Sequence, residues 1–119
     1  MISNRKQIAD ALKTVCNNIK MERPATKPTL PLVCYAEVTN VHLSSKIDRI
    51  EYQIDAYTDN FPDLIELAKA IDDVMESMGW YRTYASPDAV AKIDDNWYQK
   101  VLNYVGRIDL VQKSVIKGL

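Results

Sequence analysis

Two stretches of the chain repeat their hydrophobic residues at spacings of three and four, which is the period of an α-helix with one buried face. Ser3 is a candidate N-cap of the first stretch, residues 3–20, and Asn60 is a candidate N-cap of the second, residues 62–78. Gly79 directly follows the second stretch, as is common after a helix end. The two stripes consist of Ile8, Ala11, Leu12, Val15, Cys16 and Ile19, and of Leu64, Leu67, Ala68, Ile71, Val74, Met75 and Met78.

Other stretches carry strand patterns. Residues 32–38, 80–84 and 97–108 are rich in β-branched and aromatic residues, and residues 49–58 alternate strictly. In the alternating segment one face carries Ile50, Tyr52, Ile54 and Ala56, and the other carries Arg49, Glu51, Gln53 and Asp55. This pattern predicts a strand with one buried face and one solvated face.

The connections complete the expected topology. Residues 40–47 are polar and predict a loop, so the strands on either side of it pair most simply as an antiparallel hairpin. Three prolines within residues 22–31 predict an extended connector, and residues 85–96 predict a second loop. The last residues, 109–119, either add a short strand at 110–111 or 115–116 or fray. We therefore predict one α+β domain over residues 1–119, in the order α-β-β-α-β-β, with an antiparallel or mixed sheet of about four strands and both helices on one face.

Composition narrows the class of protein. Hydrophobic residues make up 47% of the chain, which predicts a globular fold. The formal net charge is −1, so the chain has no excess of positive charge with which to bind a nucleic acid. No apolar run approaches the length of a membrane span, and the polar start lacks the core of a signal peptide, which predicts folding in a cytoplasm. Cys16 and Cys34 are too few for a disulfide framework and predict buried thiols.

Catalytic motifs are missing from the sequence. Three glycines cannot supply a phosphate-binding loop, and a single histidine, His42, excludes sites that need two imidazoles. We expect His42 to be solvated in its polar loop. Adjacent carboxylates at Asp72-Asp73 diverge on a helix, and the Asp94-Asp95 pair predicts a solvated turn rather than a cation site. We therefore predict a protein that is not an enzyme, with no catalytic residues, no metal and no cofactor.

Charge is unevenly distributed along the chain. Residues 1–27 carry six basic and two acidic side chains, whereas residues 59–76 carry six acidic and one basic. Both segments are either solvated helix faces or complementary patches that meet between copies of the chain. The seven tyrosines and two tryptophans fit an interface or a core equally well.

Five local sequences, within residues 5–108, resemble one family. They are Pro31-Leu32-Val33-Cys34-Tyr35, Glu51-Tyr52-Gln53-Ile54-Asp55-Ala56-Tyr57, Glu66-Leu67-Ala68 with Ile71-Asp72 and Val74-Met75, Met78-Gly79-Trp80-Tyr81-Arg82, and Trp97-Tyr98-Gln99-Lys100-Val101. Together they are similar to the tail-terminator (tail-completion, head–tail joining) proteins of long-tailed bacteriophages and prophages. Gln99 departs from the family, in which a histidine is common at that place.

The resemblance implies a structural protein that forms a ring, six-fold in the family, on the head-proximal end of the tail tube. Its partners would be other copies of itself, the tail tube protein and the head connector or stopper. It would act in the host bacterial cytoplasm during assembly and then in the virion tail, with no specific nucleic-acid contact and no membrane. From the outward face of the strand at 49–58 and the loop at 40–47 beside it, we expect the interface to include His42, Lys46, Arg49, Glu51, Gln53 and Asp55. The alternatives are another neck or stopper component and a small protein-binding adaptor domain unrelated to phage.

Overall fold

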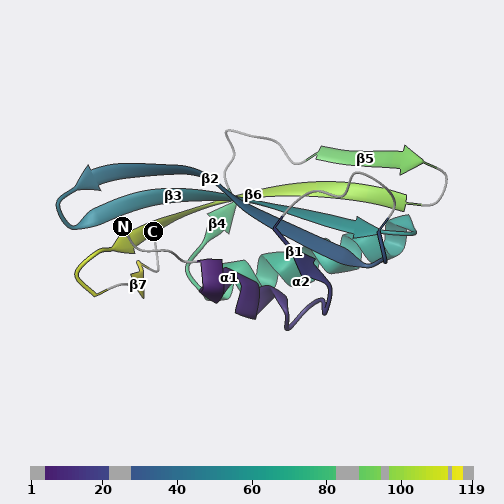
Figure 1. The fold of residues 1–119 in the computed structure, drawn as a ribbon, viewed down its shortest axis with the longest axis horizontal. Coiled ribbons are helices and arrows are strands. Elements are labelled where there is room, and N and C mark those ends of the chain that lie inside the picture. Colours follow the sequence, from purple (N-terminus) through teal and green to yellow (C-terminus); the bar gives the residue numbers. More distant parts are fainter. Residues whose placement is uncertain (1–4, 22–27, 83–88, 95–96, 113, 117–119) are drawn as a thin grey trace.

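The structure is a computed structural model that describes residues 5–21, 28–82, 89–94, 97–112 and 114–116 (Figure 1). Its two helices are α1 (Arg5–Leu12) and α2 (Phe61–Ser77). The long strands are β2 (Leu32–Ser44), β3 (Ile47–Thr58) and β6 (Trp97–Asp109), and β5 (Ala89–Asp94) is of medium length. The short strands are β1 (Ile19–Lys20), β4 (Tyr81–Arg82) and β7 (Ser114–Val115).

The strands of the described residues form one mixed sheet. Its main path is β1-β2-β3-β6-β4, and β5 and β7 also pair with β6. Only the β1–β2 pair is parallel, and the rest are antiparallel. One edge of β6 faces β3, while the other is shared in turn by β5, β4 and β7. The predicted α+β class is confirmed.

Both helices cover the same face of this sheet (Figure 1). The alternation of β3 is confirmed there, because Ile50, Tyr52 and Ile54 are buried under the helices. From α2, five residues of the predicted stripe join the core: Leu64, Leu67, Ala68, Ile71 and Met75. The helix therefore packs as its sequence period indicated.

Local sequence signals fix the ends of α2 within one residue of the predicted bounds. The Asn60 side chain accepts a hydrogen bond from the backbone N–H of Asp63 at 2.9 Å, which satisfies one of the free donors of the first turn. Gly79 has a φ of 96°, a value that favours glycine over residues with a Cβ.

The opposite face of the sheet is not wholly solvated, which corrects part of the prediction. A second cluster lies there, formed by Leu32, Cys34, Tyr57 and Trp97. It buries Asp55, which is only 3% exposed, because Asp55 lies between Cys34 and Val101 in the register of the sheet. Cys16 and Cys34 are both buried, as predicted, in the first and the second cluster respectively.

The first helix is much shorter than predicted. It ends at Leu12, and the chain then turns, with the Thr14 hydroxyl donating to the carbonyl of Ala11. Thr, Val and Asn disfavour helix interiors, and residues 14–18 are Thr-Val-Cys-Asn-Asn. Ile19 therefore lies in β1, where it pairs with Val33 instead of extending the helix.

The predicted loop at residues 40–47 was wrong. Strand β2 continues to Ser44, and only Ser45 and Lys46 turn the chain before β3 begins at Ile47. This part of the hairpin extends past the helices (Figure 1). Residues 41–46 are exposed, so burial does not disfavour polar side chains there. Their backbones therefore hydrogen-bond between β2 and β3 as readily as those of apolar residues.

The predicted loop at residues 85–96 was also wrong in part. Residues 89–94 form β5, antiparallel to the first half of β6, while residues 85–88 and 95–96 lie outside the described residues. The edge of β6 supplies the hydrogen-bonding partner, a long-range contact that the local sequence does not report. At the other end of β6, β7 matches the predicted short strand near residues 115–116.

Candidate functional site

Two surfaces at opposite ends of the molecule are candidates for function. The first, the hairpin tip, comprises residues 38–49 of β2, the turn and β3. The second, the acidic groove, lies where β3 meets the start of α2. Strand β3 connects them, with Ile47 at the tip and Thr58 at the groove, and its twelve residues span roughly 35–40 Å. The molecule measures 49 Å along its longest axis.

At the hairpin tip the structure places His42 beside Asp48. The His42 Nδ1 and Asp48 Oδ1 atoms lie 2.6 Å apart. The His42 side chain is 63% exposed, whereas that of Asp48 is 7% exposed. The expectation of a solvated His42 holds for its exposure, but its setting is a strand rather than a loop. The imidazole is therefore held in place by a buried carboxyl group.

The other predicted interface residues follow from the tip along β3. Lys46 lies exposed in the turn, and within the described part of the chain its ammonium group forms no ion pair. Arg49 and Glu51 form an ion pair with each other at 2.8 Å. Gln53 donates to Asp55 at 3.1 Å. The structure thus places His42, Lys46 and Arg49 in the tip, whereas Glu51, Gln53 and Asp55 lie further along β3 toward the centre of the sheet.

The sequence reasoning missed three apolar residues at the tip. Val38, Val41 and Leu43 are 51%, 46% and 48% exposed. Val38 and Leu43 fall in the two register shifts between β2 and β3, and β-bulges at a sheet edge commonly redirect side chains. The available signal was the apolar character of Val41 and Leu43 within the predicted loop at 40–47, whereas Val38 lies at the end of the predicted strand at 32–38. The tip therefore combines an exposed cation with exposed aliphatic side chains.

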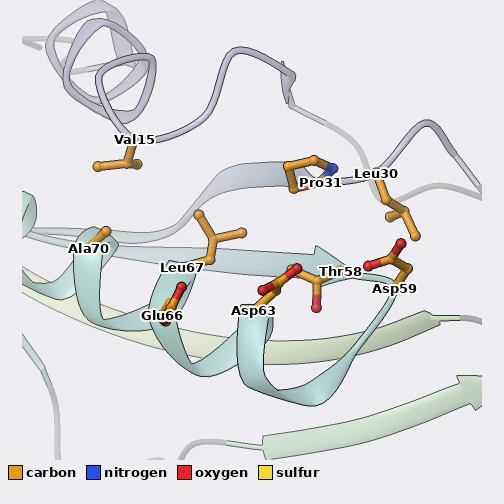
Figure 2. Close-up of a pocket in the computed structure, with 9 residues that line it drawn as sticks. All are labelled: Val15, Leu30, Pro31, Thr58, Asp59, Asp63, Glu66, Leu67 and Ala70. Atoms are coloured by element: carbon orange, nitrogen blue, oxygen red, sulfur yellow. The ribbon is translucent and has the colours of Figure 1, made fainter.

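The acidic groove has a volume of about 530 Å³ (Figure 2). Its apolar lining is Val15, Leu30, Pro31, Leu67 and Ala70, and its polar lining is Thr58, Asp59, Asp63 and Glu66. Figure 2 shows Leu67 projecting from α2 toward the side of Pro31 and Val15, with the carboxylates along the rim. No basic residue lies among these lining residues, so the rim is uniformly negative.

Two of the rim carboxylates are held by one side chain. The amide of Asn60 donates to Asp59 at 3.0 Å and to Asp63 at 2.8 Å. Asn60 thus caps α2 and at the same time fixes the two acidic groups at the groove. Half of the six acidic residues of the negative segment at 59–76 therefore lie on this groove, a clustering that the sequence showed only as a charge run.

A third polar cluster lies where α2 crosses β4 and β6. The Tyr104 hydroxyl donates to Asp72 Oδ1 at 2.8 Å, and Arg82 Nε lies 3.9 Å from the same oxygen. Burial, reinforced by the hydrogen bond to Asp72, raises the pKa of Tyr104 well above its ordinary value. Asp73 is exposed, so the two adjacent carboxylates diverge as predicted. Asp72 positions Tyr104 in the core.

Tyr52 lies on the same face in a different environment. Burial is the main cause that raises its pKa to about 12. Its ring packs edge-on against Trp80, with centroids 5.3 Å apart. Its hydroxyl is buried and has no hydrogen-bond partner among the described residues.

The described residues hold no group of three or more side chains able to share a metal ion. Asp94, one of the two predicted turn carboxylates, lies in β5 opposite Trp97, and Asp95 lies outside the described residues. Among the described helices none combines the length and the hydropathy required to cross a bilayer.

No protein-family model matches the chain, and no curated protein matches it. Among solved structures, it is similar to a chain of the virion of a native gene transfer agent (GTA) particle. The TM-score is 0.65 at 11% sequence identity, and the match covers 86% of this chain and 91% of the other. The two chains share a fold over nearly their whole lengths.

Proposed function

We propose that this chain is a structural component of a phage-like virion, and specifically a tail terminator that forms a ring at the head-proximal end of the tail tube. The observation that carries the proposal is the shared fold with a chain of a GTA virion over 86% of this chain. The local sequences at residues 31–35, 51–57 and 78–82 support the finer assignment, since they resemble the terminator family.

The surfaces of the molecule fit such a role. A ring requires two different patches on each subunit, because a contact repeated about an axis joins one surface to another. The hairpin tip and the acidic groove are two such patches at opposite ends. The partners of the chain would be other copies, the tail tube protein and the head connector, and its place would be the bacterial cytoplasm during assembly and then the virion tail.

The test is deletion of the gene in the cell that carries it, followed by electron microscopy of the particles. A terminator predicts tail tubes of irregular length and heads without tails, and a plasmid copy of the same gene should restore uniform tails. Tails of normal length attached to heads in the deletion strain would overturn the terminator assignment. Normal tails detached from filled heads would favour the alternative, a neck or stopper component.

A further inference from the structure

The hairpin tip and the acidic groove differ in ways that make each fit the other. The tip exposes the aliphatic side chains of Val41 and Leu43 together with the cation of Lys46. The groove has an apolar floor that includes Leu67 and a rim of carboxylates that includes Glu66. Apolar surface would be buried against apolar surface, and the charges at the margin are of opposite sign.

One molecule cannot bring these two surfaces together. The tip and the groove lie at the two ends of β3, roughly 35–40 Å apart along a continuous strand that is paired on both sides. Any contact between them must therefore join two copies. Such a contact is head-to-tail, and it closes into a ring if the rotation between neighbours permits.

We propose that the hairpin tip of one copy docks into the acidic groove of the next copy. The occupant of the groove is thus a second copy of this chain, with Leu43 near the apolar floor and Lys46 near Glu66. The inference rests on the proposed function only in requiring that copies assemble. It gives that assembly a defined interface and a defined polarity.

The basic segment at residues 1–27 is the competing partner for the groove. Within residues 5–21, Lys6 pairs with Asp10 at 2.8 Å and Arg5 lies 3.9 Å from Glu37, whereas Lys13 and Lys20 are exposed. The tip differs because its cation, Lys46, lies near two exposed aliphatic side chains, Val41 and Leu43, which can cover the apolar floor. The proposed contact therefore uses the tip.

The decisive experiment is cross-linking with a short bismaleimide, applied to the purified protein at high concentration and to assembled particles. The double variant Leu43→Cys with Ala70→Cys places one thiol at the tip and one in the groove. We expect a ladder of dimer, trimer and higher species on a denaturing gel. The matched control is Leu43→Cys with Met21→Cys, which moves the second thiol to an exposed apolar residue outside both the tip and the groove. It should give no ladder, and neither should the unaltered chain, whose Cys16 and Cys34 are buried.

Two outcomes would overturn the inference. A dimer without higher species from Leu43→Cys alone would show that two tips meet symmetrically. A double variant that matches its control in both the protein and the particles would show that the groove is not the partner of the tip. Either result leaves the deletion phenotype intact, so failure of this interface is distinguishable from failure of the proposed function.

Charge reversal gives a second, independent measurement. We expect Lys46→Glu and Glu66→Lys each to weaken self-association about five-fold, and the two together to return it to within about two-fold of the unaltered chain. Glu76→Lys is the control, because it makes the same charge change on the same helix outside the groove. Additive weakening in the double variant would contradict the proposed contact.

Discussion

Tyr52 and Tyr104 are both fully buried beneath the helices, yet their hydroxyl groups are in different situations. Tyr104 donates to the carboxylate of Asp72, whereas the Tyr52 hydroxyl has no partner among the described residues. A buried hydroxyl stabilises a fold only when it is hydrogen-bonded. A comparison of the two residues therefore measures how much one hydrogen bond in this core contributes to the free energy of unfolding.

We expect Tyr104→Phe to lower the free energy of unfolding by about 1–2 kcal/mol, since it removes a hydrogen bond to a charged group. Tyr52→Phe should leave it unchanged or raise it slightly, because it removes an unpartnered polar atom. Urea unfolding followed by circular dichroism measures both. An equal loss for the two variants would mean that the Tyr52 hydroxyl is bonded after all.

The raised pKa values of these tyrosines also predict how stability depends on pH. In the unfolded chain a tyrosine has a pKa of about 10, whereas Tyr52 reaches about 12 in the fold and the pKa of Tyr104 is also raised. The folded state thus holds its protons more tightly, so this stabilisation is complete below about pH 10 and is lost as pH rises through 10 to 12. The melting temperature should fall over that interval, and fall less in Tyr52→Phe. Tyr81→Phe, which changes an exposed ring, is the control.

At the scale of elements, β6 passes close under the corner between α2 and β4. Trp80 fills this corner and is 2% exposed. A Cβ added to Gly106 would lie 2.6 Å from Trp80 Cε3 and 2.7 Å from Cζ3, which is closer than atoms can pack. Gly106 therefore interrupts the apolar pattern of β6 because a large aromatic ring occupies the space above it.

Gly106→Ala should destabilise the protein by about 1–3 kcal/mol, since either the strand or the indole ring must move. Combining it with Trp80→Phe should cost less than the sum of the two single changes, because the smaller ring leaves room for the methyl group. Thermal unfolding of the four proteins in this cycle gives the coupling. Strict additivity would show that Gly106 and Trp80 do not share the space.

At the scale of the whole molecule, the hairpin tip extends past the helices and exposes Val38, Val41 and Leu43 (Figure 1). These side chains contribute little to the core, so their presence is not explained by folding. Arg49 and Glu51 pair with each other at 2.8 Å, and their place in an interface stays a prediction. The exposed apolar residues and Lys46 are the part of the hairpin that the proposed contact uses.

The triple variant Val38→Thr, Val41→Thr, Leu43→Thr should leave the free energy of unfolding within about 0.5 kcal/mol of the unaltered chain, because all three sites are exposed. Threonine also keeps the preference for strands. Self-association, measured by light scattering over a range of concentrations, should weaken. The control is Met21→Thr, an exposed site outside the tip. Unchanged association in the triple variant would show that the tip is not an interface.

The candidate surfaces were only partly visible in the sequence. The acidic run at 59–76 was evident, but not that Asp59, Asp63 and Glu66 lie around an apolar floor that includes Val15 and Pro31, because the floor comes from distant segments. His42 was singled out, but not its contact with Asp48, because that contact depends on how β2 and β3 are registered.

The sequence by itself determined the features that depend on neighbouring residues. Helical periodicity placed α2, Asn60 and Gly79 marked its ends, and alternation placed β3, because local hydrogen bonds and one-sided burial leave a direct trace in the order of residues. Only the tertiary structure decided the extension of β2 to Ser44 and the existence of β5. Each of these strands hydrogen-bonds to the backbone of another strand, β3 for β2 and β6 for β5. Backbone groups are the same in every residue, so the local sequence does not indicate which partner strand is present.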